Sequence, residues 1–222
     1  MPPTTPGRFI VFEGIDGVGK TTQSKLLADN LQKEGFPVLL TVEPGGTSFG
    51  RYIKKILTEQ PDLHPTTRLM LFMAARRENV ALVREALSAG THVICDRFLW
   101  STLAYQGSMG VSTGLIRSAH ALVSDGLAPD CTVYLDMDPE LAIARSVARG
   151  ETLSVFESTP GLMKKIRTSY LELAFSSKTG GRVFFHSADA SMEAIEAAIF
   201  HDVREFLLSP NERASSHAAK GR

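Results

Sequence analysis

Gly-Ile-Asp-Gly-Val-Gly-Lys-Thr, residues 14–21, is the stretch that decides the fold. It fits the pattern G-x-x-x-x-G-K-[S/T], in which glycines let backbone N–H groups surround phosphate oxygens without a Cβ clash. The stretch follows an apolar run at 8–12 and precedes an amphipathic segment at 20–34, as a strand–loop–helix unit requires. We therefore predict that ATP phosphates bind to Gly14, Ile15, Asp16, Gly17, Val18, Gly19, Lys20, Thr21 and Thr22.

The rest of the chain alternates short apolar runs with helical patterns. We expect strands at 8–12, 37–42, 91–95, 131–135 and 182–186. Helices are expected at 20–34, from 48, and at 65–89, 139–149, 159–177 and 191–208. Strands of about five residues separated by helices indicate βαβ units. The fold class is therefore α/β, with a five-stranded parallel sheet flanked by helices.

Composition narrows the function classes. The 222 residues carry 24 basic and 24 acidic side chains, which argues against a nucleic-acid partner. No apolar run reaches the roughly 20 residues of a membrane span, and the first residues lack the apolar core of a secretory signal. Cys95 and Cys131 lie in strand-like runs and are interpreted as buried thiols in a reducing, cytoplasmic compartment. We expect one domain at 8–208, a flexible N-terminus at 1–7 and a disordered tail at 209–222.

Further motifs follow the predicted strands. Glu43-Pro44-Gly45-Gly46-Thr47 comes after the second strand, with Arg51 one turn into the next helix. Phe72 and Arg76 are four residues apart and share one helix face, which suits a base and a phosphate. Asp96-Arg97-Phe98 follows the third strand, where a carboxylate commonly holds Mg²⁺ or its waters and an arginine can bind a second phosphate.

A phosphate loop alone does not name a reaction. The Asn-Lys-x-Asp tetrapeptide of GTPases is absent from the sequence, and a motor or helicase would usually be longer or more basic. The combination of motifs, however, resembles the bacterial thymidylate kinases. The resemblance covers about 8–208 and is carried by the stretches at 12–22, 43–47, 96–98, 104–107 (Ala-Tyr-Gln-Gly), 129–130 (Pro-Asp) and 148–151 (Ala-Arg-Gly-Glu).

The resemblance implies a P-loop nucleoside monophosphate kinase fold with a short lid, a homodimer, and Mg²⁺-dependent transfer of phosphate from ATP to dTMP in dTTP biosynthesis. It implies that Lys20, Arg97, Arg149 and Asp16 are catalytic, with Asp16 also on the sugar 3′-hydroxyl. Thr21, Asp96 and Glu13 are the expected metal group. The implied dTMP-binding residues are Asp16, Glu43, Pro44, Arg51, Phe72, Arg76, Arg97, Ser101, Thr102, Tyr105, Gln106 and Tyr170.

Within that set, the resemblance assigns Phe72 to stacking on thymine, and Thr102 and Gln106 to the base. Arg76, Arg97 and Arg51 are expected around the dTMP phosphate. Tyr105 is expected against the deoxyribose, where it disfavours a 2′-hydroxyl, and Tyr170 near the nucleoside.

The lid, at about 149–157, departs from the family pattern. Some relatives carry a basic residue where this chain has Gly17; others place the arginine in the lid, as Arg149 does here. The usual Asp-Arg-x-Glu is replaced by Leu153-Ser154-Val155-Phe156-Glu157, so Arg145 or Lys164 could share the task.

Two other functions stay open on sequence alone. One is a kinase for a different nucleoside or nucleoside monophosphate, since thymine differs from uracil by one methyl group, a contact worth about 1–3 kcal/mol. The other is a catalytically weak nucleotide-binding or regulatory protein on the same scaffold.

Overall fold

A parallel sheet forms the centre of the molecule. The computed structural model describes residues 5–150, 152–176 and 181–210. Its strands are β1 (Phe9–Glu13), β2 (Val38–Val42), β3 (His92–Asp96), β4 (Cys131–Asp136) and β5 (Arg182–Ser187). The described strands run parallel in the order β2-β3-β1-β4-β5, with β1 at the centre. The predicted α/β fold with five parallel strands is confirmed.

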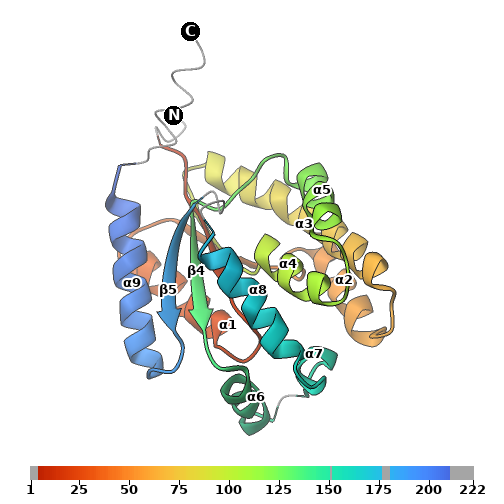
Figure 1. Ribbon diagram of the computed structural model, residues 1–222. Coiled ribbons are helices and arrows are strands. Elements are labelled where there is room, and N and C mark those ends of the chain that lie inside the picture. The colour runs from red at the N-terminus through yellow and green to blue at the C-terminus, as the bar shows by residue number, and fades with distance from the viewer. Residues whose placement is uncertain (1–4, 151, 177–180, 211–222) are drawn as a thin grey trace.

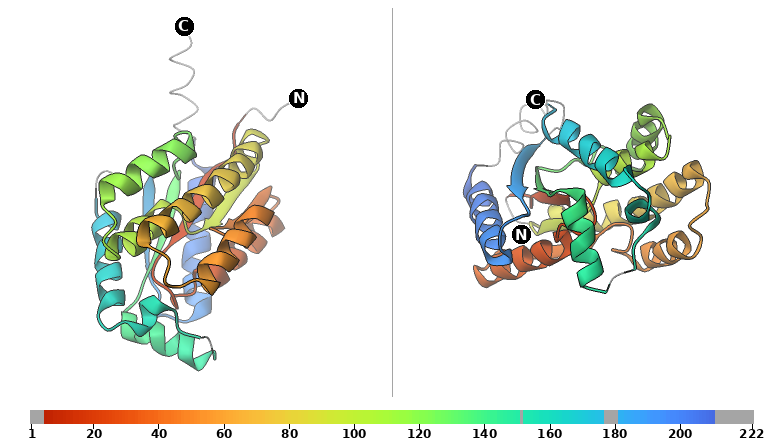
Figure 2. Two further views of the ribbon diagram at one scale, coloured as in Figure 1. Left: turned by 90° about the vertical axis from the view of Figure 1, so that its right-hand side faces the viewer. Right: turned by 60° about the horizontal axis from the view of Figure 1, so that its bottom comes forward.

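Helices cover both faces of this sheet (Figures 1 and 2). The described helices are α1 (Lys20–Lys33), α2 (Ser48–Glu59), α3 (Pro65–Ser88), α4 (Leu99–Ser108), α5 (Thr113–Ser124), α6 (Pro139–Ala148), α7 (Val155–Ser158), α8 (Leu162–Ala174) and α9 (Met192–Leu208). Helices α1 and α9 pack together on one face, and α3, α4, α5 and α8 form the layer on the other. Helices α6 and α7 project beyond the carboxyl end of the sheet (Figure 1).

The alternation of side chains along β1 joins the two layers. All five residues of β1 are buried. Ile10 and Phe12 belong to the apolar cluster that contains Leu27 and Leu31 of α1. The intervening Phe9 and Val11 pack in the cluster of α3, with Val80 and Val83. Because successive strand residues point to opposite faces, β1 anchors both layers and fixes the position of the loop that follows it.

Three helices were not expected from the sequence. No element was assigned between the third and fourth strands, where α4 and α5 lie, and α7 forms inside the expected lid. Helix α4 is buried on nearly every side, through Trp100 and each residue from Thr102 to Gln106. Such a helix has no polar face, so it lacks the 3.6-residue periodicity that marks a surface helix.

Both boundaries of one expected helix differ. Helix α8 spans Leu162–Ala174, after Pro160-Gly161, and not 159–177. Residues 1–4 of the expected N-terminal segment, Glu151 of the lid and 211–222 of the expected tail lie outside the described residues. Over the ranges that are described, no helix has the length and apolarity to cross a membrane.

Candidate active site

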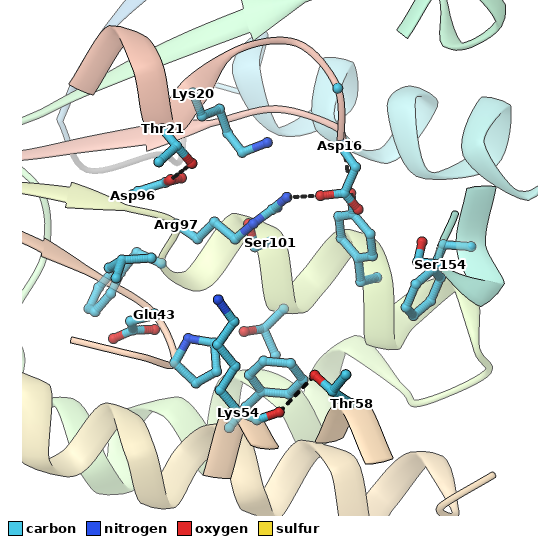
Figure 3. Close-up of a pocket in the computed structure, with 18 of the residues that line it drawn as sticks. Asp16, Lys20, Thr21, Glu43, Lys54, Thr58, Asp96, Arg97, Ser101 and Ser154 are labelled. Atoms are coloured by element: carbon cyan, nitrogen blue, oxygen red, sulfur yellow. Dashed lines mark hydrogen bonds and ion pairs between the residues drawn. The ribbon is translucent and has the colours of Figure 1, made fainter. Parts of the chain in front are cut away.

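A cleft of about 780 Å³ opens at the carboxyl ends of β1, β2 and β3, between the phosphate loop, α2, α3, α4 and the lid (Figure 3). A parallel sheet binds ligands at this end of its strands. Most of the residues expected from the sequence line it. These are Asp16, Gly17, Gly19, Lys20, Thr21, Thr22, Glu43, Pro44, Phe72, Arg76, Asp96, Arg97, Ser101, Thr102, Tyr105, Gln106 and Arg149.

The phosphate loop is held closely between β4 and α6. Gly14 has φ +144°, and a Cβ there would lie 2.4 Å from the Leu135 carbonyl oxygen. Gly17 has φ +84°, and its Cβ would lie 2.4 Å from the carbonyl oxygen of Ala142 on α6. The expected loop residues Gly14, Ile15 and Val18 do not line the cleft; the last two are buried in the core. They shape the loop, and Asp16, Gly17 and Gly19 of the same loop face the cleft.

Lys20, the first residue of α1, is buried, and its Nζ donates to the Ile15 carbonyl 2.6 Å away. Burial, followed by the nearby Arg97, lowers the pKa of Lys20 to about 8, although Asp16 and Asp96 oppose the shift. A buried lysine is stabilised in its charged form by a nearby anion. A polyanionic ligand beside Lys20 would therefore raise its pKa toward the ordinary value.

Asp96 and Thr21 meet beneath the loop. The Thr21 hydroxyl donates to Asp96 Oδ2 at 2.5 Å, and Asp96 Oδ1 is buried with no hydrogen-bond partner. In the described part of the chain, no three His, Cys, Asp or Glu side chains are grouped to hold a metal. Mg²⁺ in kinases takes one or two protein oxygens and completes its shell with waters and phosphates. A hydroxyl and an orphaned carboxylate oxygen therefore fit Mg²⁺.

Glu13, the third residue expected in the metal group, does not line the cleft with Thr21 and Asp96. Its Oε1 accepts from the backbone N–H groups of Phe98 (2.9 Å) and Ser101 (3.2 Å). Its Oε2 accepts from Ser101 Oγ (2.6 Å) and the Tyr170 hydroxyl (3.2 Å). Burial raises the pKa of Glu13 despite these hydrogen bonds. With its oxygens occupied and away from the cleft lining, Glu13 instead fixes the start of α4.

Tyr170 was expected near the nucleoside but does not line the cleft. It is fully buried on α8, and its hydroxyl lies 2.8 Å from Ser101 Oγ. It therefore supports the site from behind, a role that no local sequence pattern distinguishes from that of a tyrosine in contact with the ligand.

Arg97 connects the two halves of the cleft. It has φ +76°, a left-handed conformation that is unfavourable for a residue other than glycine and is typical of functional sites. Its guanidinium forms an ion pair with Asp16 and donates to Ser101 Oγ at 3.0 Å (Figure 3). Although burial alone would raise it, Arg97 and Lys20 hold the pKa of Asp16 below its ordinary value. Asp16 is thus a charged acceptor on the cleft wall.

Arg76 lies on the α3 side of the cleft and is 1% exposed. It forms an ion pair with Glu43 at 2.7 Å and donates to the Phe98 carbonyl and Thr102 Oγ1, each at 2.9 Å. Arg76 was expected at the phosphate of the acceptor. These partners instead group it with Thr102, one of the residues expected around the base.

A lysine of α2 was missed by the sequence analysis. Arg51, expected near the acceptor phosphate, is exposed and does not line the cleft. Lys54 and Thr58, on the same helix, do line it. The buried residues Gly50, Ile53 and Leu57 define the inward face of α2, and Lys54 adjoins them. That periodicity is the signal that could have selected Lys54 over Arg51.

The three basic residues considered for the lid differ in whether they line the cleft. Arg149, at the end of α6, lines the cleft. Arg145 donates to the Ala188 carbonyl at 2.8 Å, and Lys164 forms an exposed ion pair with Glu140 at 2.7 Å; neither lines the cleft. Because α6 packs directly on Gly17, a side chain at that loop position would clash with the Ala142 carbonyl unless the helix shifted.

A phosphate loop that faces a second cationic pocket across one cleft defines a P-loop kinase of the nucleoside monophosphate class. The order of strands and the short lid agree with that class. The chain belongs to the thymidylate kinase family, whose model, described as "Thymidylate kinase", matches residues 12–199.

Curated relatives extend over nearly the whole chain. It is 41% identical over 211 residues to the thymidylate kinase of Chromohalobacter salexigens, covering 92% of this chain and 99% of the relative. It is 41% identical over 182 residues to that of Thermomicrobium roseum, covering 81% and 80%. The thymidylate kinase of Trichormus variabilis is 35% identical over 213 residues, covering 92% and 97%.

The lowered pKa of Lys20 predicts that ATP binding takes up a proton above about pH 8. If phosphates bind beside Lys20, they should raise its pKa again, so that uptake is expected between the free and the bound values. At about pH 8.5 we expect roughly half a proton or more, measured by calorimetry in buffers of different ionisation enthalpy. Lys20→Arg, which stays charged, should abolish the uptake; equal uptake in both proteins would contradict this assignment.

Proposed function

We propose that this protein transfers the γ-phosphate of ATP to dTMP, giving dTDP, as a step in the supply of dTTP. One observation carries the proposal: a single cleft joins the phosphate loop to a second pocket that contains Arg97, Phe72 and Gln106. A donor and an acceptor can therefore lie end to end within it. Membership of the thymidylate kinase family supports the choice of dTMP as the acceptor.

The chemistry needs no general base. A phosphate monoester is largely dianionic at neutral pH and is already a nucleophile, so the obstacle is the repulsion between two polyanions. Fixed positive charge in a site that excludes water offsets this repulsion and holds the acceptor oxygen in line with the γ-phosphorus. The cleft accordingly holds Lys20, Arg97, Lys54 and Arg149.

On the donor side, the loop backbone and Lys20 bind the ATP phosphates, and Arg149 approaches the γ-phosphate from the lid. Mg²⁺, held by Thr21 and Asp96, would neutralise charge on the transferred phosphate. The unpartnered Asp96 Oδ1 supports its place there.

On the acceptor side, Arg97 and Lys54 bind the dTMP phosphate, and Asp16 accepts from the sugar 3′-hydroxyl. Phe72 stacks on the base. Arg76, held by Glu43 and Thr102, acts beside Gln106 on the base, since its partners orient it away from a phosphate role. Tyr105 lies against the deoxyribose, its ring anchored by a 2.8 Å hydrogen bond to Asp16 Oδ2.

The assignment is tested by measuring ADP release from ATP with a panel of nucleoside monophosphates. We expect Mg²⁺-dependent turnover with dTMP, weaker turnover with dUMP and little with purine monophosphates. Equal kcat/KM for dTMP and a purine monophosphate would reject dTMP as the acceptor. Binding of ATP without ADP release would identify a nucleotide-binding protein that is not a kinase.

Arg149→Ala should lower kcat by roughly 10²-fold or more, because it removes a charge that acts on the γ-phosphate in the transition state. The affinity for dTMP without ATP should change little. Arg145→Ala is the matched control on the same helix, and we expect its kcat to stay within about threefold of wild type. An inactive Arg145→Ala beside an active Arg149→Ala would show that the other arginine serves the phosphate.

We further propose that the protein is a cytoplasmic homodimer. Both cysteines are free and buried, which fits a reducing compartment. On α5, Leu115 and Leu122 are 41% and 82% exposed and, seven residues apart, share one helix face. Such an exposed apolar face suits a second copy of the chain.

The dimer is tested by light scattering after gel filtration. Leu122→Asp should convert the dimer to a monomer, because it places a charge in an apolar interface. Leu141→Asp, at a side chain of α6 that is 53% exposed, should leave the mass unchanged. A monomeric wild-type protein would reject the proposal.

A further inference from the structure

One aromatic residue of the lid reaches the acceptor side of the cleft. Phe156 lies on α7 and is 8% exposed. Its ring meets that of Tyr105 edge-to-face, with the ring centroids 4.9 Å apart and the planes at 82°. This is a favoured geometry for an aromatic pair. Both residues line the cleft, so the lid contacts the acceptor pocket through this pair.

The local sequence dictates how Phe156 is presented. Ser154 is the N-cap of α7 and forms a capping box with Glu157. Glu157 Oε2 accepts from the Ser154 backbone N–H at 2.9 Å and from its hydroxyl at 2.8 Å. This box rigidifies a single helical turn. Within that turn Val155 is 50% exposed and Phe156 is buried, so the turn has one inward side chain at its centre.

The other contacts of Tyr105 hold only part of its ring. The hydroxyl donates to Asp16 Oδ2 at 2.8 Å and accepts from the Asp16 backbone N–H at 3.0 Å. The Arg97 guanidinium lies over the ring, 5.2 Å from its centroid, and the Tyr170 ring is 6.4 Å away. These contacts come from the phosphate loop, from the residue that follows β3, and from α8. From the described part of the lid, the ring of Phe156 contacts Tyr105.

We propose that Phe156 is a specificity-determining residue: by holding the Tyr105 ring in place, it makes the preference for a 2′-deoxyribose depend on the lid. The inference rests on the proposed function, in which Tyr105 occupies the space that a 2′-hydroxyl would need. A ribonucleotide must displace the ring, and with Phe156 packed against it the ring cannot move without breaking the contact. Without Phe156 the ring can tilt toward the lid.

The test compares Phe156→Ala and Phe156→Leu with the matched control Val155→Ala, which alters the exposed side chain of the same turn. The measured quantity is the ratio of kcat/KM for dTMP to kcat/KM for ribothymidine monophosphate. We expect Phe156→Ala to lower this ratio about tenfold, the scale on which a single apolar contact discriminates substrates. Phe156→Leu should give an intermediate ratio, and Val155→Ala the wild-type one.

For a variant that turns over slowly, or for a protein that fails to phosphorylate dTMP, the selectivity is measured by calorimetry without ATP. The measured quantity is then the ratio of the dissociation constants of the two monophosphates. Failure of the proposed function is seen separately, as absent turnover by the wild-type protein. If Phe156→Ala does not fold by circular dichroism, Phe156→Leu decides the outcome.

A double-mutant cycle tests the route through Tyr105. In a Tyr105→Ala background, Phe156→Ala should not change the ratio further, because the ring it holds is gone. An unchanged ratio in the single Phe156 variants, or an equal effect with and without Tyr105, would overturn the proposal.

Discussion

Two cations, the buried Lys20 and the half-buried Arg97, lie close together beyond the carboxyl ends of β1 and β3, and the site depends on the carboxylates that face them. Burial, and then the repulsion from Arg97, lowers the pKa of Lys20. Asp16, paired with Arg97, and Asp96 limit the repulsion. Because Lys20 is buried, removing a carboxylate that faces it would leave its charge less well compensated and would destabilise the site. In the ligand-free site, the charges of Lys20 and Arg97 are thus partly compensated by Asp16 and Asp96. Bound phosphates would add further negative charge beside the two cations.

A second layer of buried polar groups holds the charged side chains of the site in position. Glu13, the last residue of β1, ties Phe98 and Ser101 to the central strand, and Tyr170 joins the same network from α8. Arg76 and Glu43 form a similar buried pair within the wall of the cleft itself. Satisfied networks of this kind order a site because every member has fixed directions for its hydrogen bonds. The positions of Ser101 and of the start of α4 are thus set by Glu13 and Tyr170, which do not line the cleft.

The strands of the sheet and the loop at 14–21 could be predicted from the sequence, because each is determined by a short, local pattern of residues. A strand of apolar residues and the spacing of Gly14, Gly19 and Lys20 require no knowledge of distant segments. Helix α4 could not be recognised, since its burial on nearly every side removes the amphipathic pattern. Glu13, Tyr170 and Lys54 were misjudged or missed for a related reason. A carboxylate or tyrosine has the same sequence signature whether it faces a ligand or supports a neighbour, and only the packing of α2 and α8 separates these roles.

The packing of α6 against Gly17 also bears on how such enzymes can diverge. With the Ala142 carbonyl 2.4 Å from where a Cβ would stand, a residue larger than glycine at this position requires a displaced helix. A substitution at position 17 is therefore coupled to the placement of α6, whose C-cap is Arg149. Under the proposed role of Arg149, a basic residue in the loop and one in the lid are not independent alternatives, because the first requires a shift of the helix that carries the second. The residues at positions 17 and 149 are therefore expected to vary together with the position of this helix.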